Sequence, residues 1–242
     1  MLRMLACCCL ALLPTSPAVA ADAPAAAVAA LAPSGTLRAA INFGNPVLAQ
    51  KDAATGLPRG VSVDLARALG QRLGVPVDLV IFEAAGKVFE ALKAGALDVA
   101  FLAIDPQRAA EIDYTAPYVA IEGAYLVPAA SPLRAVAEVD RPDVRVAVGL
   151  GSTYDLFLTR SLKHATIVRA PTSPAAVETF VRDRLEVAAG IRQPLLAYAQ
   201  AHPQTRVLPG SFMQIEQAMG LPKGRAAGHR YLRGFVEEMK AS

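Results

Sequence analysis

Arg108 is the side chain best placed to do chemistry in this sequence, because it follows a short apolar run that stops abruptly. The run Val99–Ile104 predicts a buried strand, and Asp105-Pro106 is typical of a turn. In open α/β sheets, ligands bind at the edge where the carboxyl ends of such strands lie. A guanidinium holds a carboxylate there through paired hydrogen bonds. The alternative is a surface arginine paired with Glu111, a contact that would contribute little.

A second candidate is the segment Gly149–Thr153, which follows a predicted strand and opens a predicted helix. Backbone amides at the start of a helix attract anions, and the hydroxyls of Ser152 and Thr153 add donors. Two interpretations stay open: an anion site that works together with Arg108, and an ordinary helix N-cap. A dinucleotide-binding motif would need a third glycine where Tyr154 stands, so the sequence disfavours it.

The other candidates are weaker. His164, His202 and His229 lack the spacing of metal ligands or catalytic partners, and the sequence contains no HExxH, GxSxG or Walker motif. Phe43, at the end of the first predicted strand, either lines a pocket or closes the core. We therefore expect no metal, no cofactor and no catalytic residue.

The N-terminus has the pattern of an export signal. Arg3 precedes the apolar stretch Met4–Leu13, and Ala18-Val-Ala20 is a small-x-small cleavage site, so residues 1–20 are predicted to be a signal peptide. The apolar stretch is shorter than the ~20 residues that span a bilayer. All three cysteines lie at positions 7–9, so the mature chain would form no disulfide. A lipoprotein signal cut before Cys7 is disfavoured, because the apolar stretch before it is too short.

Composition narrows the class of partner. The formal net charge is +3, the charges are scattered, and only 6% of the residues are aromatic. Without a basic stripe, nothing argues for nucleic acid. The stretch 21–34, rich in alanine and proline, is expected to be a flexible leader into the first strand.

Strands and helices are predicted to alternate along the rest of the chain. In the first unit, strands fall over 37–43, 77–82 and 98–104, with helices over 61–73 and 87–94. In the second unit, strands fall over 144–148, 166–169 and 187–191, with helices over 153–162, 174–184 and 194–201, and a last helix covers 226–240. This order predicts parallel sheets with helices on their faces.

Two such units indicate an α/β protein of two lobes. Residues 35–122 and 218–242 would form lobe 1, and residues 123–217 would form lobe 2. The segments 118–128 and 209–220 would cross between the lobes. A ligand cleft at this hinge is the natural consequence.

Several short segments, taken in order, form a recognisable pattern. They are Gly35-Thr-Leu-Arg, Gly60-Val-Ser-Val-Asp64-Leu, Leu92-Lys-Ala-Gly-Ala-Leu-Asp98-Val, Gln107-Arg108 with Ile112-Asp-Tyr-Thr-Ala-Pro-Tyr118, and Val148-Gly-Leu-Gly-Ser-Thr153. In this order and spacing, the chain from about Gly35 to its C-terminus resembles the bacterial extracellular solute-binding proteins of family 3, which are periplasmic receptors for polar amino acids.

The resemblance implies a two-lobed periplasmic binding protein of type II. Arg108 would grip the carboxylate of the ligand, helped by the amides and hydroxyls of Ser152 and Thr153, and Phe43 would form an aromatic wall. The lobes would close over the solute like a hinge. The loaded protein, expected to be a monomer in the periplasm, would then dock on the inner-membrane permease of an ABC importer. It would be a receptor and not an enzyme.

Two departures from the family bear on the ligand. The family usually places an aspartate that binds the ligand amine after the strand matching 187–190, but this region reads Gly190-Ile191-Arg192-Gln193-Pro194. The stretch from Asp98 to Arg108 is also about two residues shorter than usual. An unpaired ammonium in a cleft would cost several kcal/mol.

Two explanations follow from these departures. The ligand is an organic acid without an amine, and a dicarboxylate if Arg192 points inward. Alternatively, Glu122 near the hinge replaces the missing aspartate. A rival function uses the same scaffold, since this fold also resembles periplasmic cyclohexadienyl dehydratases, in which Glu122 would be the general acid. A membrane-kinase sensor domain is disfavoured by the lack of a transmembrane span.

Overall fold

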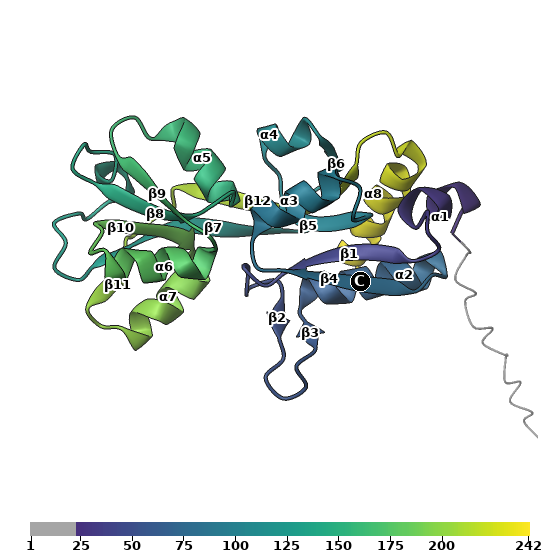
Figure 1. Ribbon diagram of the computed structural model, residues 1–242, viewed down its shortest axis with the longest axis horizontal. Coiled ribbons are helices and arrows are strands. Elements are labelled where there is room, and N and C mark those ends of the chain that lie inside the picture. Colours follow the sequence, from purple (N-terminus) through teal and green to yellow (C-terminus); the bar gives the residue numbers. More distant parts are fainter. Residues whose placement is uncertain (1–22) are drawn as a thin grey trace, which may run out of the picture.

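The molecule consists of two lobes that share one sheet. The computed structural model describes residues 23–242, so the predicted signal peptide and its cleavage site lie outside the described residues. Figure 1 shows the lobes side by side, joined by the long strands β7 (Val119–Pro128) and β12 (Met213–Pro222). The sheet has ten strands in the order β4-β1-β5-β12-β7-β10-β8-β9, with β6 paired to β12 and β11 to β7. The predicted two-lobed α/β architecture is thereby confirmed.

Lobe 1 is organised around three parallel strands, β1 (Leu37–Asn42), β4 (Val77–Phe82) and β5 (Val99–Ala103). Alternate residues of these strands face opposite sides, as the pleat requires. Helices α2 (Val61–Leu73) and α8 (Ala226–Lys240) pack on the side of Ile41, and α3 (Ala85–Lys93) packs on the side of Ala40. The short helix α4 (Pro106–Ala109) follows β5 directly.

Three short strands complete lobe 1. Strand β6 (Ile112–Tyr114) runs antiparallel to β12. Strands β2 (Gln50–Lys51) and β3 (Pro58–Arg59) form a separate hairpin, which projects from the lobe in Figure 1. The loop between β1 and this hairpin places Gly44, Asn45 and Pro46 beside residues of lobe 2.

Lobe 2 repeats the same plan with three further parallel strands, β8 (Arg145–Gly149), β9 (Thr166–Ala170) and β10 (Val187–Ile191). Its helices are α5 (Thr153–Ser161), α6 (Ser173–Arg182) and α7 (Arg192–Ala201), with a short 3₁₀ turn at Val136–Glu138 and the edge strand β11 (Thr205–Val207). The lobe boundaries predicted at 122/123 and 217/218 fall inside β7 and β12. Because these strands belong to both lobes, those boundaries stay a prediction.

The predicted flexible leader is wrong for its described part. Residues 25–31 form helix α1, and its apolar positions Ala27 and Leu31 are buried. The helix packs on α8, where Gly228 leaves room for Leu31, and Arg225 donates a hydrogen bond to the Ala30 carbonyl at 3.1 Å. A run of alanines has high helix propensity, and the α8 surface supplies the apolar partner that the sequence pattern did not reveal.

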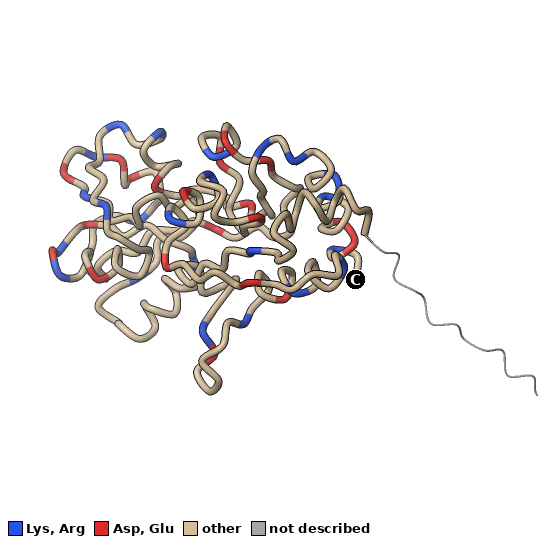
Figure 2. Tube along the Cα trace, turned by 45° about the vertical axis from the view of Figure 1, so that its right-hand side comes forward, with Lys and Arg blue, Asp and Glu red and all other residues tan. Residues whose placement is uncertain are grey.

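Charged residues of both signs are distributed along the chain of both lobes. Figure 2 shows Lys and Arg interspersed with Asp and Glu along both lobes. Within residues 23–242, the helices are too short or too polar for any of them to cross a membrane.

Candidate functional site

Arg108 lies at the junction of the two lobes. Strand β5 ends at Ala103, and Asp105 then caps α4 by accepting a hydrogen bond from the Gln107 amide at 2.9 Å, with Pro106 at the first helical position. This sharp strand-to-helix turn brings the Arg108 side chain back toward the end of β5, and Arg108 is only 1% exposed. The interpretation of Arg108 as a surface arginine is therefore wrong.

The Arg108 guanidinium bonds to neutral oxygens of both lobes. Its Nη1 donates to Thr153 Oγ1 at 3.0 Å and to the Ala103 carbonyl at 3.3 Å, and its Nη2 donates to the Gly151 carbonyl at 2.7 Å. None of the ion pairs formed within residues 23–242 includes Arg108. Burial lowers the pKa of the Arg108 guanidinium, because it removes the charge from water. A buried guanidinium whose hydrogen-bond partners are all neutral can accept a hydrogen-bonding anion in their place.

The segment Gly149–Thr153 supplies the opposing surface from lobe 2. Ser152 is the N-cap of α5, and its hydroxyl accepts a hydrogen bond from the Asp155 amide at 3.0 Å. The N-cap interpretation of Ser152 is therefore confirmed. The Gly151 amide donates to the Asp155 carboxylate at 2.8 Å, so that amide already has an anionic partner. Thr153 is the residue of this segment whose side chain contacts Arg108.

Two further contacts join the lobes. The Arg160 Nη2 atom of α5 lies 2.7 Å from the Asp105 carboxylate of lobe 1, and that carboxylate is buried. Gly86 at the start of α3 faces Gly151, and a Cβ added to Gly86 would lie 3.3 Å from the Gly151 Cα. The lobes therefore touch in this structure. The sequence indicated Asp105 only as part of a turn and gave no signal for Arg160, because their pairing depends on the packing of two lobes.

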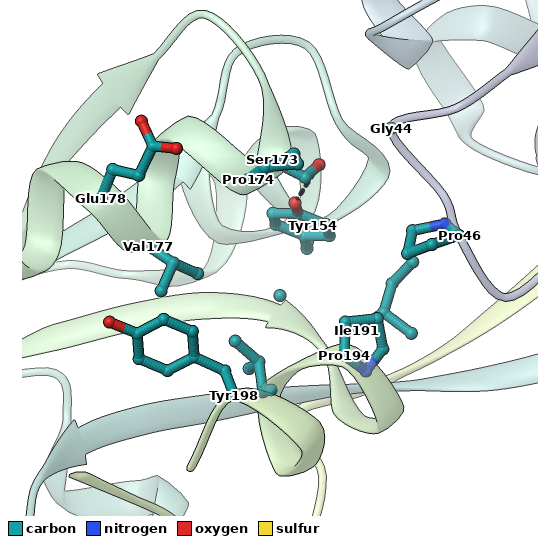
Figure 3. A pocket seen from close by; sticks show the side chains of 12 residues that line it. Gly44, Pro46, Tyr154, Ser173, Pro174, Val177, Glu178, Ile191, Pro194 and Tyr198 are labelled. Carbon is teal, nitrogen blue, oxygen red and sulfur yellow. Dashed lines mark hydrogen bonds between the residues drawn. The ribbon is translucent and has the colours of Figure 1, made fainter. Parts of the chain in front are cut away.

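Two cavities lie at this junction. The smaller, of about 40 Å³, has Arg108 and Thr153 in its wall together with Asn45 of the loop after β1. The larger, of about 260 Å³, is lined mainly by lobe 2 (Figure 3). Four residues line both cavities: Gly44, Tyr154, Ser173 and Ile191.

The comparisons identify the family. The model of the bacterial extracellular solute-binding proteins, family 3, matches residues 37–242, which is most of the chain. The chain belongs to this family. No curated protein matches it.

Solved structures support the same fold for this solute-binding protein. An ancestral amino acid-binding protein, described as a precursor of cyclohexadienyl dehydratase, is 25% identical with a TM-score of 0.74, over 89% of this chain and 94% of that one. The solute receptor for L-cysteine of Neisseria gonorrhoeae is 24% identical with a TM-score of 0.77, over 89% of each chain. Holo ArgBP from T. maritima is 19% identical with a TM-score of 0.74, over 86% of this chain and 92% of that one.

Three sequence candidates of the solute-binding protein lie away from the cavities. Phe43 packs against the core of lobe 1, which matches its second interpretation, and it lines neither cavity. Glu122 on β7 and Arg192 at the start of α7 form an ion pair with each other, and Arg192 also donates to the Gly210 carbonyl. Neither of the two lines a cavity. The structure thus brings Arg108, Ser152 and Thr153 together but not the other three.

The solute-binding protein has site residues that the sequence did not indicate. Asn45 is buried, and its Oδ1 has no hydrogen-bond partner among the described residues. Ile191, the last residue of β10, stands beside both cavities. Tyr154 and Tyr198 line the larger cavity. The loop sequence Gly44-Asn45-Pro46 after the first predicted strand was the available signal for Asn45, whereas the two tyrosines carried none.

Proposed function

We propose that this protein is an exported receptor that captures a small carboxylate without an amino group and delivers it to the inner-membrane permease of an ABC importer. The observation that carries the proposal is the state of Arg108, a guanidinium buried between two lobes with only neutral oxygen partners. Membership of the family supports the receptor function and the importer. Capture would proceed by closure of the lobes over the solute.

A carboxylate is the anion that fits Arg108 best. A buried charge without an opposite charge is costly, and a carboxylate would supply two acceptor oxygens in the geometry of the guanidinium fork. The bonds from Arg108 to Thr153 and Gly151 show that both terminal nitrogens of the guanidinium, Nη1 and Nη2, face lobe 2 when the lobes touch. A solute entering an open cleft would take the place of these neutral acceptors.

The absence of an amino group from the solute is supported by the wall of the smaller cavity. Among the described residues that line it, charge is contributed by Arg108, and none is an aspartate or a glutamate. Ile191 occupies the end of β10, near where the family usually places its aspartate. An ammonium here would be buried against a methyl surface at a cost of several kcal/mol.

Asn45 offers a neutral alternative to that aspartate. Its buried Oδ1 lacks a partner and lies in the wall of the cavity that also contains Arg108. A neutral amide oxygen accepts a hydrogen bond from a hydroxyl group. A 2-hydroxy acid would therefore satisfy both Arg108 and Asn45.

The general acid that the sequence suggested for the rival enzyme function lines neither cavity. A dehydratase would need a carboxylic acid beside the leaving hydroxyl. Glu122, the sequence candidate, is 40% exposed and paired with Arg192, and it lines neither cavity. The geometry of the described residues therefore favours a receptor.

The test is a binding comparison of acids that differ only at the second carbon. The purified protein is unfolded and refolded to remove any solute carried from the host, and melting temperatures are measured with matched 2-hydroxy, 2-oxo and 2-amino acids. Specific binding raises the melting temperature by mass action. We expect shifts with the hydroxy or oxo acids and none with the amino acids. Shifts with the amino acids would overturn the amine-free solute, and no shift with any acid would overturn the carboxylate receptor.

A further inference from the structure

The larger cavity is an apolar space with a defined composition. Its wall is formed in lobe 2 by Val177 of α6, Ile191 of β10, and Pro194, Leu195 and Tyr198 of α7. Figure 3 shows Val177, Ile191, Pro194 and Tyr198 around one space, with Gly44 and Pro46 of lobe 1 on its other side. A cavity of about 260 Å³ with such a wall is suited to a hydrocarbon group.

We propose that this cavity receives an apolar tail of the solute, so that the protein selects carboxylates carrying a branched aliphatic or aromatic group. The inference rests on the proposed function, because it takes Arg108 as the site of the carboxylate. Gly44, Tyr154, Ser173 and Ile191 belong to the wall of both cavities, so the two cavities lie next to each other. A molecule whose carboxylate lies at Arg108 therefore has the larger cavity directly beside it.

The sizes of the two cavities support this division. About 40 Å³ is near the share of one water molecule in the liquid, so the smaller cavity has no room for an apolar tail while the lobes touch. An apolar cavity of about 150 Å³ is known to bind benzene. The larger cavity, at about 260 Å³, has room for a phenyl or isobutyl group.

Few polar groups line the larger cavity, and Glu178 is the charged one among the described residues of its wall. The Tyr154 hydroxyl donates to Ser173 Oγ at 2.5 Å, so these two groups satisfy each other (Figure 3). The carboxylate of Glu178 points away from the centre of the cavity in Figure 3. The ring of Tyr198 is held by stacking on His202, with the ring centroids 3.9 Å apart. An apolar tail therefore matches this wall better than a guanidinium or ammonium tail.

Both lobes contribute to this wall, which links tail burial to closure. Gly44 has no room for a side chain, because a Cβ there would lie 2.4 Å from the Glu83 carbonyl oxygen. An apolar tail would be covered by Gly44 and Pro46 only when the lobes come together, so a larger tail should favour the closed state.

The test varies the tail at a constant head group. Calorimetric titrations are made with lactate, 2-hydroxy-4-methylpentanoate and phenyllactate. These acids carry a methyl, an isobutyl and a benzyl tail, respectively. Each buried methylene adds roughly fourfold in affinity, so we expect the two larger acids to bind at least tenfold more tightly than lactate. Equal affinities for the three acids would overturn the tail site.

Two valines on α6 provide a matched pair of variants. Val177→Phe fills the cavity, whereas Val181→Phe adds the same ring to an exposed position of the same helix. We expect Val177→Phe to lower the affinity for phenyllactate at least tenfold and to leave lactate unchanged, and Val181→Phe to change neither. Equal behaviour of the two variants would overturn the inference. If Val177→Phe does not fold, Val177→Ala should raise the affinity ratio of phenyllactate to 2-hydroxy-4-methylpentanoate, and an unchanged ratio would overturn it.

Failure of the proposed function gives a different result. The primary amide of phenyllactic acid keeps the tail and lacks the negative charge. If the amide binds as tightly as phenyllactate, and its binding is weakened by Val177→Phe, the tail site stands and the carboxylate at Arg108 is wrong. If phenyllactate binding is lost in Arg108→Ala but insensitive to Val177→Phe, the carboxylate site stands and the tail site is wrong. If neither the acids nor the amide bind, the tail site is also overturned.

Discussion

Arg108 and Arg192 occupy equivalent places in the two lobes, and the protein uses them differently. Each follows an apolar parallel strand and begins or lies in the helix after it, α4 in lobe 1 and α7 in lobe 2. Arg108 is buried without a carboxylate, whereas Arg192 is paired with Glu122. The position of an arginine after a strand therefore does not decide whether the arginine is free to bind a ligand.

The distance of each arginine from the end of its strand decides it. Next to β10 lies β7, and the pairing of Ile191 with Gly123 places Glu122 beside Arg192, which follows β10 directly. Next to β5 lies β12, and the pairing of Ala103 with Gln217 places Glu216 at the corresponding point, beside Ile104. Arg108 lies further on, in α4, and none of the ion pairs within residues 23–242 includes it.

The largest expected effect is a difference in carboxylate affinity between variants of Arg108 and variants of Arg192. Arg108→Ala should weaken carboxylate binding by on the order of 100-fold or more, because each charged hydrogen bond contributes ~1.5–3 kcal/mol. Arg108→Lys should recover little of the loss, since an ammonium cannot form the paired bonds of a guanidinium. Arg192→Ala, measured by the same titration, should bind as the wild type does. Equal losses of affinity in Arg108→Ala and Arg192→Ala would contradict the different roles assigned to the two arginines.

The next effect concerns the missing acid at the end of β10. Ile191→Asp places a carboxylate in the wall of both cavities, where it could pair with the amine of an α-amino acid. We expect the affinity ratio of amino acid to matched hydroxy acid to rise at least tenfold, and the melting temperature of the ligand-free variant to fall because the new charge is buried. Ile191→Asn is the neutral control. A ratio that rises equally in both variants would show that charge is not the cause.

A smaller effect is expected from the ion pair between the lobes. Arg160→Ala removes the partner of the buried Asp105 and leaves the cap that Asp105 provides to α4. Because Arg160 is partly exposed, we expect a loss of about 1 kcal/mol, which is roughly fivefold in affinity. Small-angle scattering should show a more open ligand-free protein. Arg182→Ala, which removes an exposed pair within lobe 2, serves as the control and should change neither quantity.

The smallest effect is expected at Glu122. Glu122→Gln breaks a partly exposed ion pair, so the free energy of unfolding should fall by about 1 kcal/mol or less. Carboxylate affinity should stay unchanged, because Glu122 lies outside both cavities. A large loss of affinity would return Glu122 to the binding site. If the wild-type protein turns over a substrate and Glu122→Gln does not, the result would support the enzyme function instead.

Local patterns predicted most of the fold. The apolar positions Val61, Leu65, Leu69 and Leu73 gave helix α2 its bounds, and the apolar runs gave the parallel strands to within about one residue. Helix α7 begins two residues before its predicted start, because Pro194 is tolerated in the first turn of a helix. Strand β12 was predicted only as part of the crossover segment 209–220, since residues 213–217 are extended through their pairing with β7.

The candidate site was harder to predict, because residues that are brought together by distant parts of the chain leave little local signal. Arg108, Ser152 and Thr153 follow strand ends and helix starts, which leave a local signal. Asn45 lies in a loop, and the contacts that bury it come from segments far away in the sequence. Phe43, the neighbouring aromatic residue that the sequence offered as a pocket wall, packs against the core of lobe 1.

The sharing of β7 and β12 by both lobes has a consequence for amide hydrogen exchange. These strands pair from Gly123 with Met213 to Val119 with Gln217, inside the single continuous sheet. Opening the lobes must twist this ribbon while its hydrogen bonds persist, so the ribbon amides exchange slowly whether the cleft is open or closed. Closure is reported instead by amides at the contact between the lobes, such as those of Gly86 and Gly151. The exchange map of the protein would thus contrast a protected hinge with a contact surface that responds to solute.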